Sequence, residues 1–143
     1  MSSVVLIADS MEHTNHGTGV YLGKGYVLTA AHVATAWNDR KVGSFDDKHY
    51  YPVQFVWRDD DQDIALLKFV VVPEDAHSSE ISCDTLHLDD EVTMVGYPLM
   101  FPKTLAHGRI GSANYIGSDR AVLTIIAAMP GNSGSPIFND KGK

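Results

Sequence analysis

Three polar residues in the sequence lie among small or apolar residues and could together carry acyl-transfer chemistry. Ser133 is at the centre of "MPGNSGSPIF", His32 is in "VLTAAHVATAW", and Asp63 directly precedes "IALLKF". A serine hydroxyl needs a base to take its proton, an imidazole can do so near neutrality, and a carboxylate can orient that imidazole and stabilise its cation. Together, the three side chains supply what transfer of an acyl group to water requires.

Taken singly, each residue also has an ordinary structural interpretation. Glycine, asparagine, serine and proline are common turn residues, so Ser133 could lie at a loop tip. A histidine among small apolar residues is usually a core residue with hydrogen-bond partners, and an aspartate at the start of a strand is usually a turn or edge residue. The acids just before Asp63, which are Asp59, Asp60 and Asp61, are interpreted as a solvated turn.

The residues around Ser133 and the order of the three candidates reduce the number of enzyme classes that fit the sequence. Gly131 allows a turn in which its own N–H and that of Ser133 point at the place where a carbonyl oxygen becomes negative. The order histidine, aspartate, serine differs from that of α/β-hydrolases, and Pro136 leads into the strand-like "PIF" instead of a helix. Cys83 in "ISCDTL" has no thiol-protease or metal-site context and is interpreted as a structural residue.

The elements that must position these residues are predicted to be short strands. Apolar or alternating runs recur at intervals typical of antiparallel β-structure, and only Thr29 to Trp37, rich in alanine, favours a turn or two of helix. The "GKG" segment, Gly23 to Gly25, predicts a tight hairpin. The runs are "SVVLI", "GVYLG", "GYVLTA", "PVQFVW", "IALLKFVVV", "EVTMVGY", "HGRIGSANYI", "AVLTII" and "SPIF".

A polar segment, "PEDAHSSEISCDTLHLDD", divides these strands into two groups. We therefore predict an all-β protein with an antiparallel β-barrel over residues 1–72, a linker over 73–90 and a second barrel over 91–143, because closure removes the exposed edges of short strands. Six strands are expected before the linker and only four after it. The second barrel is thus expected to be incomplete, and the chain to be a truncated or processed piece.

Composition and charge argue against several classes of function. The 143 residues are 44% hydrophobic, with 18 acidic and 11 basic residues and a formal net charge of −7. Because lysine and arginine form no cluster, the chain is not expected to bind nucleic acid or an anionic membrane. The lack of a long apolar run, of a signal-like start and of cysteine pairs predicts a cytoplasmic protein, in the host cytoplasm if the source is viral.

The other histidines do not predict a metal site. His13 and His16 in "HTNH" have no third ligand pattern beside them and are interpreted as loop residues. His107 in "LAHGRIGS" is interpreted as a strand residue.

Several motifs, in this order along the chain, resemble those of the chymotrypsin-fold serine proteases. The resemblance is greatest to the branch that includes the high-temperature-requirement (Deg) proteases and related viral serine proteases. The motifs are "GTGVYLGKGYVLTAAHV", "DIALLKF", "VTMVGYPLMFPKTLAHGRIGS" and "PGNSGSPIF". The resemblance implies two antiparallel barrels, no metal and no cofactor, with His32 as general base, Asp63 as orienting acid and Ser133 as nucleophile.

Two positions depart from the family pattern. Asn132 stands where secreted digestive relatives carry an aspartate that pairs with a newly cut N-terminus, so activation of that kind is not expected. Ser135 replaces the usual second glycine. The resemblance also implies that one wall of the primary specificity pocket is uncharged and suits a small or medium apolar side chain. The residues of that wall are Ala127, Ala128 and Met129.

These observations predict a serine endopeptidase that cuts polypeptides through an acyl-enzyme on Ser133. The alternative is a truncated or non-catalytic protease-like module that binds peptides without cutting them. The intact set of three candidate residues favours the enzyme, and the short C-terminal part favours the alternative. The last strand, Ser135 to Phe138, is expected to expose unpaired backbone groups, an edge through which the chain could self-associate.

Overall fold

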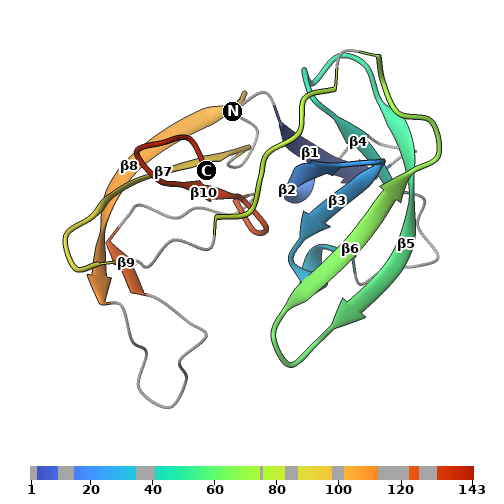
Figure 1. The fold of residues 1–143 in the computed structure, drawn as a ribbon. Helices are drawn as coiled ribbons and strands as arrows, with labels where there is room; N and C mark the ends of the chain where they lie inside the picture. Colours follow the sequence, from blue (N-terminus) through green and yellow to red (C-terminus); the bar gives the residue numbers. More distant parts are fainter. Residues whose placement is uncertain are drawn as a thin grey trace.

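The chain is all-β over the residues that the structure, a computed structural model, describes. These are residues 3–9, 15–34, 41–74, 76–82, 87–97, 102–112, 123–125 and 132–143. A closed barrel of six antiparallel strands lies beside a four-stranded antiparallel sheet (Figure 1). The predicted all-β class is confirmed.

The strands of the barrel are joined in the order β1-β2-β3-β6-β5-β4, and those of the sheet in the order β10-β7-β8-β9. The barrel contains β1 (Val4–Asp9), β2 (Asn15–Gly23), β3 (Tyr26–Thr29), β4 (Lys41–Ser44), β5 (Tyr51–Asp59) and β6 (Ile64–Phe69). The sheet contains β7 (Glu91–Gly96), β8 (Thr104–Ser112), β9 (Leu123–Ile125) and β10 (Ile137–Phe138). The helical segment of the described residues is a 3-10 turn, η1 (Ala31–Ala34), after β3.

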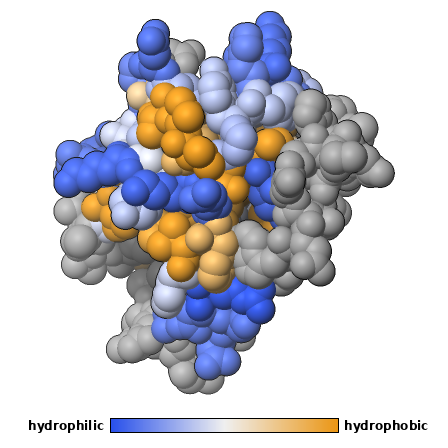
Figure 2. All heavy atoms as spheres, turned by 90° about the vertical axis from the view of Figure 1, so that its right-hand side faces the viewer, coloured by the Kyte–Doolittle hydropathy of each residue, from blue (hydrophilic) through white to orange (hydrophobic). Residues whose placement is uncertain are grey.

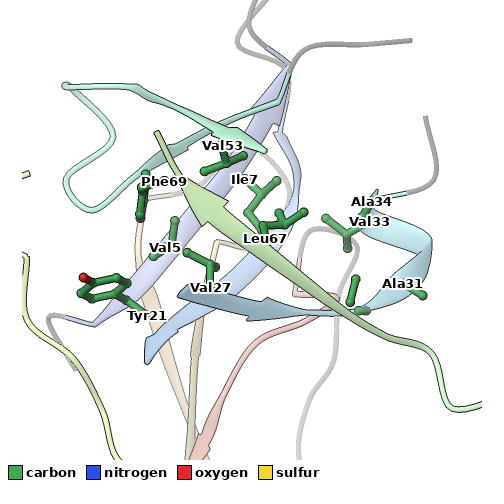
Figure 3. Packing of buried hydrophobic residues seen from close by; sticks show 12 residues of the cluster. Val5, Ile7, Tyr21, Val27, Ala31, Val33, Ala34, Val53, Leu67 and Phe69 are labelled. Carbon is green, nitrogen blue, oxygen red and sulfur yellow. The ribbon is translucent and has the colours of Figure 1, made fainter. Parts of the chain in front are cut away.

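Apolar side chains from the strands and from η1 fill the barrel (Figure 3). Ala31, Val33 and Ala34 of η1 are buried in this core, which leaves His32 between them on the outside. Burial of a valine or leucine side chain stabilises a fold by about 1.5–3 kcal/mol, so η1 is held in place by packing. The core consists of Val5, Ile7, Tyr21, Val27, Ala30, Ala31, Val33, Ala34, Val53, Ala65, Leu67 and Phe69.

A second apolar cluster joins the barrel to the sheet. Val4 and Leu6 of β1 face away from the barrel core, since successive side chains of a strand alternate. They pack instead with Val95, Tyr97 and Phe138 of the second sheet. β1 is therefore buried on both faces, which explains why its sequence is a continuous apolar run.

The hairpin predicted at Gly23 to Gly25 is present between β2 and β3. Lys24 has a φ of 54° and Gly25 a φ of 91°. Positive φ at both central residues is the signature of the two-residue hairpin turn that suits the twist of antiparallel strands. The turn places Thr29 and the start of η1 beside β2, because Gly19 pairs with Thr29 across the hairpin.

The described part of the predicted linker is tied to the barrel and to the residues after β10. The N–H of Ser79 donates to the carbonyl of Tyr21 over 2.9 Å, and the hydroxyls of Ser3 and Ser79 form a hydrogen bond. Lys143 Nζ lies 3.3 Å from Glu80 Oε2. Figure 1 shows this segment passing between barrel and sheet. The domain boundaries at residues 72 and 91 stay a prediction.

The turn or two of helix predicted over Thr29 to Trp37 corresponds to a 3-10 turn of four residues among those described. Two strands differ from the sequence-based prediction. β4 has no counterpart among the apolar runs, because "KVGS" is short and half polar. The last strand is confined to Ile137–Phe138, since Asn132 to Ser135 forms a turn in which the Ser135 N–H donates to the Asn132 carbonyl over 2.9 Å.

Exposed apolar side chains on the barrel are interrupted by polar ones. Figure 2 shows hydrophobic patches separated by hydrophilic residues on this side of the molecule. Phe55, Val56 and Trp57 of β5 are exposed, and so are Val70 and Val71 after β6. Apolar residues scattered in this way are ordinary for a protein surface.

Candidate active site

His32 and Asp63 form a hydrogen-bonded pair, as an orienting carboxylate and a base would. Asp63 Oδ2 lies 2.6 Å from His32 Nδ1, and Asp63 Oδ1 accepts the His32 backbone N–H over 2.9 Å. The two bonds fix both the ring and the backbone of His32 relative to one carboxylate. A carboxylate that holds Nδ1 in this way is the arrangement in which an imidazole transfers a proton through its other ring nitrogen, Nε2.

The turn between β5 and β6 delivers Asp63 to this position. Asp59 Oδ1 accepts the N–H of Asp61 over 3.0 Å and that of Gln62 over 3.3 Å, which confirms that these acids form an exposed turn. Asp63 itself has a φ of 57°. This left-handed conformation is uncommon for a residue other than glycine and is tolerated where the surroundings hold it. Here the two hydrogen bonds with His32 do so.

The pKa of Asp63 is lowered. Burial alone would raise this pKa, but hydrogen bonds from the His32 backbone and ring, the charge of His32 and the N–H of Ala31 together outweigh it. Asp63 is therefore a carboxylate at neutral pH. The side chains of His32 and Asp63 are 56% and 49% exposed, so the pair is open to solvent in this structure.

The loop that carries Ser133 is fastened to the barrel through Thr18 of β2. The Thr18 N–H donates to the Ser133 carbonyl over 2.8 Å, and the Thr18 carbonyl accepts the Thr29 hydroxyl over 2.6 Å. The Thr18 hydroxyl in turn accepts the N–H of Tyr97, after β7, over 3.1 Å. One buried threonine thus connects β2, the end of β3, the second sheet and the serine loop.

Two glycines permit the close approach of the loop to the barrel. A Cβ on Gly17 would lie 2.6 Å from the Val33 side chain and 2.9 Å from the Ser133 carbonyl oxygen. Gly134 has a φ of 83°, and a Cβ there would come closer than 3.0 Å to the Thr18 carbonyl and the Thr29 hydroxyl. No side chain fits at either position without displacing the loop.

These contacts place the loop that carries Ser133 beside η1, the turn that carries His32 of the hydrogen-bonded pair, at one corner of the molecule where barrel and sheet meet. Gly134 packs against Thr29 and Ala30, which directly precede η1 and His32. The other predicted site residues, which are Gly131, Ala127, Ala128 and Met129, lie outside the described residues.

Sequence reasoning missed two residues of this corner. The sequence pattern assigns no functional role to Thr18 or Thr29. The signal for Thr18 in the sequence is that it stands between two glycines in "GTG". A threonine buried at such a place needs hydrogen-bond partners for its hydroxyl.

A depression of about 300 Å³ adjoins the pair on the side of Asp63. Its lining is mostly apolar and comes from the barrel and the serine loop. The lining residues are Val20, Leu28, Thr29, Ala30, Asp63, Ile64, Gly134, Ser135 and Pro136. Asp63 thus lies on the rim of a concave surface that extends along the serine loop.

Within the described residues, no group of three or more histidine, cysteine, aspartate or glutamate side chains is placed to hold a metal ion. His107 lies on β8, as predicted, and its Nδ1 is 3.1 Å from the Thr93 hydroxyl. His13 and Cys83 lie outside the described residues, and of His16 only the backbone, in β2, is described. No described helix has the length and apolarity needed to cross a membrane.

Barrel, sheet and the site at their junction define a protein of the chymotrypsin-like β-barrel class. Residues 17–143 match the trypsin-like peptidase domain, and the chain belongs to that family. The crystal structure of a serine endoprotease from Yersinia pestis superimposes with a TM-score of 0.84 and 26% sequence identity, over 99% of this chain and 51% of that one.

Relatives of known sequence are similar along most of the chain. Protease Do-like 2, chloroplastic, from Arabidopsis thaliana is 34% identical over 142 residues, which cover 92% of this chain and 23% of that protein. Glutamyl endopeptidase from Staphylococcus epidermidis is 27% identical over 146 residues, which cover 89% of this chain and 51% of that protein. The chain thus spans about half or less of the length of these relatives.

Proposed function

We propose that this chain is the catalytic part of a serine endopeptidase, with Ser133 as nucleophile, His32 as general base and Asp63 as the carboxylate that orients it. The observation that carries the proposal is the pair of hydrogen bonds from His32 to Asp63, at the corner where Thr18 fastens the serine loop. Membership of the trypsin-like peptidase family supports it.

The proposed reaction follows from these roles. His32 Nε2 takes the proton of the Ser133 hydroxyl while the Ser133 oxygen attacks the carbonyl carbon of the substrate. The imidazolium then gives that proton to the leaving amine. Asp63 stabilises the imidazolium. Water repeats the sequence on the acyl-enzyme and releases the acid. The N–H groups of Gly131 and Ser133 are proposed to stabilise the oxyanion.

The substrate is proposed to be a polypeptide, because relatives named as endoproteases and endopeptidases share this domain. We keep the proposal that the residue on the acyl side of the cut is small or medium and apolar, with Ala127, Ala128 and Met129 along one wall of its pocket. Substrate libraries that vary this one residue test the preference, and a preference for charged side chains would contradict it.

Reaction with a fluorophosphonate probe tests the proposed nucleophile. The probe forms a covalent adduct with an activated serine, and peptide mapping locates it. The proposal predicts one adduct, on Ser133, which is lost in Ser133→Ala. The matched control is Ser78→Ala, because Ser78 lies beside Gly23, at the β2–β3 turn, whereas His32 follows the other end of β3. An adduct on another residue, or none on a folded chain, would contradict the proposal.

The second candidate function, binding of extended peptides without cleavage, is favoured by the edge of β10. Within the described residues, β10 pairs with β7 alone, at Ile137 with Met94 and Phe138 with Thr93. The Ile137 side chain is 42% exposed. A free strand edge can take up another strand, from a peptide or a second copy of the chain. Concentration-dependent sedimentation tests self-association, and substituting Ile137→Lys would abolish it if this edge is used.

A further inference from the structure

Gly96, the last residue of β7, faces the serine loop from the side opposite the barrel. A Cβ on Gly96 would come closer than 3.0 Å to Ser135 Oγ and to Asn132 Oδ1. It would lie 3.3 Å from Ser135 Cβ. Both polar atoms therefore point at the space that the missing side chain leaves. The loop is enclosed between Thr18 on the barrel side and Gly96 on the sheet side.

The two polar atoms are buried, and neither has a hydrogen-bond partner among the described residues. A buried polar atom left unpaired costs about 1–3 kcal/mol, so these atoms do not hold the loop by hydrogen bonding at this point. At this point the contact between the loop and Gly96 is therefore steric. The Val95 N–H donates to the Pro136 carbonyl over 3.3 Å, and beyond it β10 pairs with β7.

β7 is the rigid partner in this contact. This strand is paired on both sides, with β8 and with β10. The two residues that flank Gly96, Val95 and Tyr97, are buried in the cluster that joins barrel and sheet. A side chain at position 96 would therefore move the loop more readily than the strand.

We propose that Gly96 is a positioning residue for the nucleophile: the absence of a side chain at position 96 sets how closely Asn132 and Ser135 approach β7, and through them the place of Ser133. The reactivity part of this inference rests on the proposed function. Displacement of a reacting group by about 1 Å can cost on the order of a hundred-fold in rate. A single methyl group at position 96 is large enough to cause such a displacement.

The substitution Gly96→Ala tests this with two measurements. The first is hydrogen exchange at the Thr18 amide, which is protected by its bond to the Ser133 carbonyl and so reports loop docking without any catalysis. The second is the rate of fluorophosphonate labelling of Ser133. We expect exchange at Thr18 to become at least about ten-fold faster and labelling to slow on the order of a hundred-fold.

Two compensating substitutions separate positioning from general damage to the fold. Asn132→Ala with Ser135→Gly removes both polar atoms that the added methyl would meet, so adding these two substitutions to Gly96→Ala should regain most of the Thr18 protection and of the labelling rate. The matched control is Gly43→Ala. Its added Cβ would lie 3.0 Å from the Phe69 ring and from the Val5 side chain, in the barrel core and away from the loop. This control should lower thermal stability and leave both readouts unchanged.

The outcomes decide between the two hypotheses. Unchanged Thr18 exchange and labelling in Gly96→Ala would overturn the inference, and so would a loss that Asn132→Ala with Ser135→Gly does not restore. If the unaltered chain itself does not label, the proposed function fails, and exchange at Thr18 alone decides whether Gly96 positions the loop. If Gly96→Ala does not fold, Ser135→Thr adds a methyl from the loop side, and the same two measurements apply to it.

Discussion

Replacing Gly134 by alanine tests how tightly the serine loop is docked on the barrel. Gly134 has a φ of 83°, and its Cβ would collide with the Thr18 carbonyl and the Thr29 hydroxyl. Gly142 has nearly the same backbone conformation, with a φ of 77°, but a Cβ there would meet nothing within 4 Å. The pair therefore separates the cost of the backbone conformation from the cost of the collision.

The expected magnitudes follow from these two terms. The left-handed conformation costs a residue with a side chain about 1–2 kcal/mol, which both variants lose. Overpacking adds about 1–3 kcal/mol at Gly134 alone. Gly142→Ala should thus lower the free energy of unfolding by about 1–2 kcal/mol, and Gly134→Ala by about 2–5 kcal/mol.

Urea unfolding followed by circular dichroism measures both changes, provided that the slope with denaturant is the same in the variants. Hydrogen exchange at the Thr18 amide gives a second readout. Exchange at this amide should become faster in Gly134→Ala and stay unchanged in Gly142→Ala. Equal losses of stability in the two variants would refute the reasoning, because the loop would then yield to the extra methyl at no cost.

Three further predictions concern single interactions. Thr29→Val removes the buried donor to the Thr18 carbonyl and should cost about 1–3 kcal/mol in urea unfolding, whereas Thr104→Val, whose exposed hydroxyl donates to Pro102, should change stability by less than about 0.5 kcal/mol. Because the pKa of Asp63 is lowered in the fold, its stabilising contribution is complete above the ordinary carboxyl pKa of about 3.9 and is lost as the pH falls through the folded value. The stability difference between the unaltered chain and Asp63→Asn should therefore shrink in acid, and a difference that stays constant down to pH about 2 would contradict this. Burial, a hydrogen bond to Asp47 and nearby negative charge raise the pKa of Tyr50 to about 12, so the unaltered chain should lose stability between pH about 10 and 12 while Tyr50→Phe loses less.

Much of the fold could be predicted from the sequence because its strands are short, apolar and separated by clear turns. The "GKG" hairpin and the solvated turn at Asp59 to Asp61 follow from local residue preferences, and both are confirmed. β4 could not be predicted in this way, because "KVGS" has no pattern of its own and pairs through its neighbours β1 and β5. The last strand is shorter than predicted, since the turn at Asn132 to Ser135 takes residues that the apolar pattern assigned to it.

Some residues of the candidate site could likewise be predicted from the sequence, and others could not. His32 and Asp63 could be chosen from residue type and position, and the structure places them in hydrogen-bonded contact. Thr18 and Gly96 act through contacts with residues more than 30 positions away in the chain, and no local pattern reports such contacts. Their roles become visible only when barrel and sheet are assembled around the serine loop.

A double-mutant cycle shows directly whether His32 and Asp63 act on Ser133 as one unit. The measurement is the rate of fluorophosphonate labelling of Ser133 in the unaltered chain, His32→Ala, Asp63→Asn and the double variant. If Asp63 acts only through His32, the double variant should label as slowly as His32→Ala and no slower, because groups that act as a unit are not additive. Losses in the two single variants that multiply in the double variant would contradict the claim.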